Sequence, residues 1–74
     1  MESVYIYPFY DGEDNTVDTV VARSRVEAEE RIIRKITDDY EDIPYPADYV
    51  DLKSSLLDVG MVLGDVIELD ELLN

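Results

Sequence analysis

The chain has neither cysteine nor histidine among its 74 residues. The absence of cysteine excludes disulfides and thiolate metal sites. The absence of histidine removes the commonest general base and the commonest transition-metal ligand. No uninterrupted apolar stretch approaches the roughly 18 residues of a membrane-spanning helix. Because the amino terminus also lacks the basic start of a secretory signal, we expect a cytoplasmic protein, in the host cell if the source is viral.

Positive charge is also scarce, because six lysines and arginines face 19 aspartates and glutamates, for a formal net charge of -13. Self-repulsion at this density destabilises the compact state, and a small domain has only about 5–15 kcal/mol of stability. We therefore expect the excess negative charge to serve recognition of a strongly basic partner, since electrostatic attraction between opposite charges speeds the encounter of two proteins. The same charge argues against direct contact with nucleic acid or with anionic membrane surfaces.

The charge is unevenly distributed along the chain. Residues 23–35 carry five bases and three acids, whereas residues 36–74 carry eleven acids and one base. Within the basic stretch, Glu27 and Glu30 each precede an arginine by four residues, an arrangement that stabilises a helix. The arginines are thus balanced within their own helix, and the acidic surface belongs to the carboxyl-terminal half.

Hydrophobic patterning predicts two strands followed by a helix. Residues 4–10 are β-branched and aromatic, and a turn-rich segment separates them from a second strand at 17–22. Pro8 cannot donate a ladder hydrogen bond, which predicts an edge strand or a bulge. Ser24 and Glu27 form a capping-box pattern that begins a helix over 25–40. Its apolar face is predicted to contain Val26, Ile32, Ile33, Ile36 and Tyr40.

The second half of the chain predicts a helix and a last strand. A helix is expected to start at Pro46 or Ala47 and to stop at Gly60, with a strand at 49–53 as the alternative. A short strand follows at 66–69. The fold class is therefore α+β in one domain, residues 1–74. It is a small, largely antiparallel three-stranded sheet (β-hairpin, helix, second helix, final strand) with helices on one face.

The residue types present argue against an enzyme. The serines have no neighbouring base to activate them, and catalysis by carboxylates alone needs a cleft that a chain this short has little volume to form. The acidic segment that begins at Asp11 spaces oxygen ligands as calcium loops do, but it lacks the Gly and Glu of an EF-hand loop. We expect no cofactor and no metal, and interpret this segment as a solvated hairpin tip.

The candidate partner-binding surface consists of carboxylates, with two aromatic anchors. Four acids cluster at the end of the first predicted helix, where negative charge opposes the helix dipole, and local rules tend to be broken where function requires it. Three more acids line the second helix. Tyr5 and Tyr7 share one strand face and are either interface anchors or a core layer, with equal weight. The set is Asp38, Asp39, Glu41, Asp42, Asp48, Asp51, Asp58, Tyr5 and Tyr7.

Two functional hypotheses follow from these observations. In the first, the carboxylates imitate the phosphate ladder, and the protein docks onto a basic, nucleic-acid-binding surface of a partner protein and blocks it. In size and charge the chain is similar to the DNA-mimic inhibitors of bacteriophages and mobile elements, including anti-restriction and anti-CRISPR proteins. In the second, it is a non-enzymatic accessory or assembly protein that binds through strand-edge tyrosines and apolar contacts. Self-association into a homodimer through the first strand is a variant of the second hypothesis.

Overall fold

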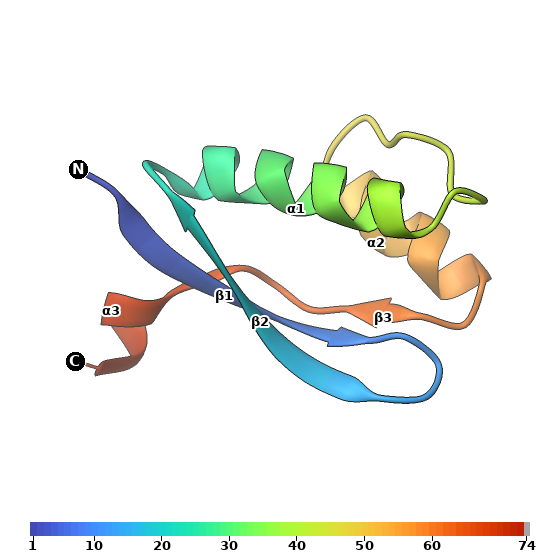
Figure 1. Ribbon diagram of the computed structural model, residues 1–74, viewed down its shortest axis with the longest axis horizontal. Helices are drawn as coiled ribbons and strands as arrows, with labels where there is room; N and C mark the ends of the chain where they lie inside the picture. Colours follow the sequence, from blue (N-terminus) through green and yellow to red (C-terminus); the bar gives the residue numbers. More distant parts are fainter. Residues whose placement is uncertain (74) are drawn as a thin grey trace.

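The computed structural model describes residues 1–73 and has the predicted α+β architecture. In chain order, the elements are β1 (Ser3–Tyr10), β2 (Asn15–Ala22), α1 (Arg25–Asp39), α2 (Tyr49–Asp58), β3 (Val62–Leu63), β4 (Ile67–Glu68) and α3 (Leu69–Leu73). The sheet is antiparallel and has four strands instead of three. Strand β4 lies within the predicted final strand at 66–69, whereas β3 at 62–63 was not predicted. Helices α1 and α2 lie on the same side of the sheet (Figure 1).

The prediction that β1 is an edge strand is wrong. Strand β1 lies at the centre of the sheet, with β2 on one side and both β3 and β4 on the other. The carbonyl of Pro8 accepts a 2.9 Å hydrogen bond from the Gly64 amide, so its backbone faces the β3–β4 side. Gly64 lies in the break between those two short strands. Proline is tolerated at the centre of this sheet because its missing amide hydrogen faces that break.

The hairpin between β1 and β2 has a continuous register from Ser3 opposite Ala22 to Tyr10 opposite Asn15. Its loop, residues 11–14, is shorter than the segment 11–16 that separates the two predicted strands. The Asp11 amide donates to the Asp14 carbonyl at 3.2 Å, and Gly12 takes the positive φ of 104° that the turn requires.

Helix α1 begins as predicted at Ser24, whose hydroxyl accepts a 3.1 Å hydrogen bond from the Glu27 amide. The Glu27 carboxylate accepts from Arg31 at 3.1 Å. The predicted buried face holds for Ile32, Ile33 and Ile36. It fails at Val26, which is 64% exposed.

Helix α2 starts later than predicted. Asp48 caps it by accepting a hydrogen bond from the Asp51 amide at 2.8 Å, so Pro46 and Ala47 stay outside the helix. An aspartate side chain at the cap can accept a hydrogen bond from a backbone amide of the first turn, which a proline side chain cannot do. The helix ends at Gly60 as expected, since Met61 donates to the Leu56 carbonyl and Gly60 to that of Leu57. This is a Schellman motif, with the positive φ at glycine that it favours.

The core lies between the sheet and the two longer helices. Its fully buried side chains include Tyr7 from β1, Ile32 from α1, and Leu52 and Leu56 from α2. None of the helices within the described residues is long and apolar enough to cross a bilayer.

Candidate functional site

Four carboxylates surround a surface hollow where α1 ends. Asp38 and Asp39 are the last residues of the helix, and Glu41 and Asp42 lie in the loop that follows. All four are exposed. The hollow measures about 420 Å³, and its other lining residues are Tyr40, Ile43, Val59 and Met61. We call these eight residues the acidic hollow; it combines a charged rim with an apolar base, because Ile43 and Met61 belong to the core.

The position of this cluster is electrostatically unfavourable for the helix. The carbonyl end of a helix carries a partial negative charge, and the last turn of α1 contains no basic residue. The backbone continues away from the helix through Tyr40, whose amide still donates to the Ile36 carbonyl at 3.0 Å. The four acids therefore oppose the helix dipole without a cation in that turn to compensate.

The other three predicted carboxylates divide between the two ends of α2. Asp58 ends the helix and directly precedes Val59, which lines the acidic hollow. Asp48 and Asp51 lie at the start, where both carboxylates bind backbone amides: Asp48 accepts from the Asp51 amide, and Asp51 accepts from that of Ala47 at 2.9 Å. These two aspartates cap a helix, a role that explains their presence without any partner.

Tyr5 and Tyr7 are buried in the core, with 5% and 1% of their surfaces exposed. Their burial raises the pKa of both hydroxyls. Of the two interpretations of the aromatic row, the structure favours the core layer, because side chains this buried offer a partner almost no contact area. The expected anchors are therefore unavailable at the surface of the folded chain.

The remaining aromatic residues of interest have different environments. The Tyr49 hydroxyl donates to the Gly64 carbonyl at 2.7 Å, and burial raises its pKa strongly. Tyr40 packs edge-on against Phe9, with ring centroids 6.0 Å apart. Tyr45, which lies between the two prolines at 44 and 46, is 67% exposed. It is the only strongly exposed aromatic side chain among the described residues.

Few carboxylates have a cationic partner. Within residues 1–73, the ion pairs are Arg31–Glu27 at 3.1 Å, Arg25–Glu71 at 3.7 Å and Lys53–Asp65 at 2.6 Å. The ammonium of Lys53 lowers the pKa of the Asp65 carboxyl. None of these pairs includes a member of the acidic hollow, so its negative charge is not neutralised by ion pairing inside the protein.

The acidic hairpin tip is organised by its own backbone. The Asp11 carboxylate accepts hydrogen bonds from the amides of Glu13 at 2.9 Å and Asp14 at 2.8 Å, and these bonds lower its pKa. No cluster of three or more acids positioned to hold a metal ion occurs in the part of the chain that the structure describes.

Comparison with protein-family models, with curated proteins and with solved structures finds no match to this chain. Function is therefore inferred from the residues and their geometry alone.

Sequence reasoning missed a second surface. The sheet face opposite α1 and α2 stays open, and the alternation of Val17, Thr19 and Val21 along β2 was the available signal.

Proposed function

We propose that this protein is a small, non-enzymatic binding protein that docks its acidic hollow onto a basic surface of a partner protein. The basic surface is of the kind that normally holds nucleic acid, so docking blocks it as a DNA mimic does. The observation that carries the proposal is the placement of Asp38, Asp39, Glu41 and Asp42 around one hollow at a helix carboxyl end. This placement opposes the helix dipole, and a stability cost of this kind is expected where binding requires the charge.

The apolar base of the hollow adds to the proposal. Arginine and lysine side chains have long apolar stems below their charged ends. A basic side chain entering the acidic hollow can pack its stem on Val59, which is 57% exposed, while its charge meets the rim. Specific contacts of both kinds would distinguish recognition from diffuse attraction between opposite charges.

A charge-matched pair of variants tests the proposal. In the first, all four rim carboxylates become amides: Asp38→Asn, Asp39→Asn, Glu41→Gln and Asp42→Asn. In the control, four exposed acids elsewhere become amides: Glu2→Gln, Glu13→Gln, Asp14→Asn and Asp70→Asn. Both variants have the same net charge, so a difference between them reports the location of the charge and not its total.

Each protein is immobilised and exposed to a cell lysate at low salt, and the proteins that elute as salt rises are identified. A captured protein is then purified and bound to labelled duplex DNA, and the free chain is titrated in. We expect the wild type and the control to retain the partner and displace the DNA, and the rim variant to lose both properties. Retention by the rim variant, or retention unchanged from about 0.1 to 0.5 M salt, would refute the proposal because exposed charge interactions are screened over that range.

A further inference from the structure

The strand residues on the sheet face opposite α1 and α2 include no carboxylate and no cation. Cross-strand partners in an antiparallel pair project to the same face. The register therefore brings one set of side chains together there: Val4, Ile6, Pro8 and Tyr10 from β1, Asn15, Val17, Thr19 and Val21 from β2, Val62 from β3 and Ile67 from β4. We call these ten residues the open sheet face. About a third of the chain is charged, so a face of this size without a carboxylate or a cation is unusual.

The open sheet face is accessible along its whole length. None of its ten residues is buried. Val17 is 65% exposed, Val62 50% and Val21 45%. Three strand widths of about 4.8 Å and eight residues of about 3.3 Å give a projected area of roughly 400 Å². A contiguous apolar patch of a few hundred Å² on a small protein marks an interaction surface.

The strand carboxylates project away from this face. Asp18 lies opposite Tyr7 and Glu68 lies opposite Tyr5, so both acids project to the side of the sheet that packs on the helices. A basic partner would find no carboxylate on the open sheet face. A second copy of this chain, which repels the first everywhere else, can approach over this uncharged face with both sets of strand carboxylates directed outward.

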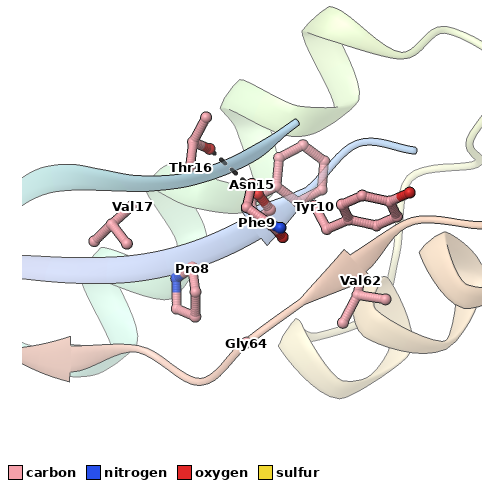
Figure 2. Close-up of a pocket in the computed structure, with 8 residues that line it drawn as sticks. All are labelled: Pro8, Phe9, Tyr10, Asn15, Thr16, Val17, Val62 and Gly64. Carbon is pink, nitrogen blue, oxygen red and sulfur yellow. Dashed lines mark hydrogen bonds between the residues drawn. The ribbon is translucent and has the colours of Figure 1, made fainter. Parts of the chain in front are cut away.

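The face has a hollow at one end and exposed valines at the other. A hollow of about 260 Å³ lies at one end, where Pro8, Val17 and Val62 surround it (Figure 2). The other end carries the exposed pair Val4 and Val21. A two-fold axis in the interface plane, at right angles to the strands and above Ile6, sets Val4 and Val21 of each copy against the hollow of the other. Such reciprocal contacts are what a two-fold dimer requires.

We propose that two copies of this chain form a dimer by packing their open sheet faces together as a sandwich, with the sheets about 10 Å apart. Burying the roughly 400 Å² of this face on each copy gives a total near 800 Å², the size of a weak or transient interface. The dimer is therefore expected to be weak and to form only at high protein concentration. It leaves both acidic hollows outside the interface, so the proposal does not depend on the proposed function.

Sedimentation equilibrium over a concentration series, at about 0.1 and 0.5 M sodium chloride, tests the dimer. Association should strengthen with salt, because screening reduces the repulsion between two chains of charge -13. Docking of the acidic hollow on a basic partner should weaken over the same range, so the two proposals can fail separately. At a protein concentration of about 1 mM, a dimer with a dissociation constant as weak as about 1 mM would still hold about half of the chains. A wild type that stays monomeric at both salt concentrations up to about 1 mM therefore overturns the dimer.

Matched variants locate the interface. Val17→Glu and Thr19→Glu each place a carboxylate on the open sheet face and should raise the dissociation constant at least about tenfold. Val50→Glu is the control, because Val50 is 70% exposed on α2, away from the sheet. Circular dichroism establishes that each variant is folded, and Thr19, already polar and exposed, keeps the test valid if Val17→Glu does not fold. A dimer that survives both sheet variants, or that Val50→Glu disrupts equally, would contradict this interface.

Discussion

Replacing Gly64 by alanine should destabilise the fold. Gly64 lies between β3 and β4 in the chain, and there is no room for a methyl group between it and Pro8 of the central strand β1. An ideal Cβ at this position would overlap Cγ of Pro8 and lie 2.9 Å from its Cδ. The proline ring belongs to the central strand and cannot rotate away. The Gly64 backbone is also fixed at both polar groups, since its amide donates to Pro8 and its carbonyl accepts from the Tyr49 hydroxyl.

The magnitude follows from two opposing effects. Overpacking a well-packed site costs about 1–3 kcal/mol. Gly64 does not have a positive φ, so alanine also gains about 0.4–1 kcal/mol by restricting the unfolded chain. The net loss should be about 1–2 kcal/mol, which lowers Tm by roughly 5–15 °C in a domain of this size.

A double-mutant cycle with Pro8→Ala isolates the cause. Without the ring, the nearest remaining atom of residue 8 is its Cβ, 3.5 Å from the new methyl group, which is an ordinary contact. In that background, Gly64→Ala should be neutral or slightly stabilising. Urea denaturation followed by circular dichroism measures all four proteins. An equal loss with and without the proline ring would show that the steric argument is mistaken.

Three further predictions concern the tyrosines and the acidic hollow. Tyr7→Ala should cost about 3–5 kcal/mol of unfolding free energy, because the side chain is 1% exposed, whereas Tyr45→Ala at an exposed position should change it by less than about 0.5 kcal/mol. Asp38→Asn and Asp39→Asn should each stabilise α1 by about 0.3–1 kcal/mol at low salt, by removing charge that opposes the helix dipole. Above about pH 10, unfolding free energy should fall with rising pH, since tyrosines ionise in the unfolded chain while the pKa of Tyr49 stays raised by burial; Tyr49→Phe should make that slope shallower.

Denaturation in urea checks the first two of these predictions, and the same experiment over a pH series checks the third. A Tyr7→Ala protein as stable as Tyr45→Ala would mean that the aromatic row lies at the surface after all. If Asp38→Asn and Asp39→Asn instead lower the unfolding free energy, the two aspartates do not destabilise α1, and the electrostatic argument is mistaken. A slope above pH 10 that is unchanged by Tyr49→Phe would contradict the burial of that hydroxyl.

Local patterns were sufficient to predict most elements. The β-branched and aromatic run gave the first strand, Ser24 predicted the start of α1, and Gly60 predicted the end of α2. Each of these features depends on residues within a few positions of one another, so the chain specifies them before any tertiary contact forms. The charge that defines the acidic hollow was equally visible, because Asp38 to Asp42 lie together in the chain.

Sheet order and burial were not predictable in the same way. A proline such as Pro8 normally indicates an edge strand. Here the interruption between β3 and β4 near Gly64 allows it at the centre of the sheet. Tyr5 and Tyr7 could belong to either face, and only the side on which α1 and α2 pack made them core residues.

Amino-acid order alone determined the start of α1, the end of α2, the hairpin and the surplus of negative charge, because these depend on neighbours in the chain and on simple counts. Tertiary packing decided which strand is central, which tyrosines are buried, and which sheet face is left uncovered and uncharged. The physical reason is that a strand has two faces of similar composition here, and the helices can cover only one of them.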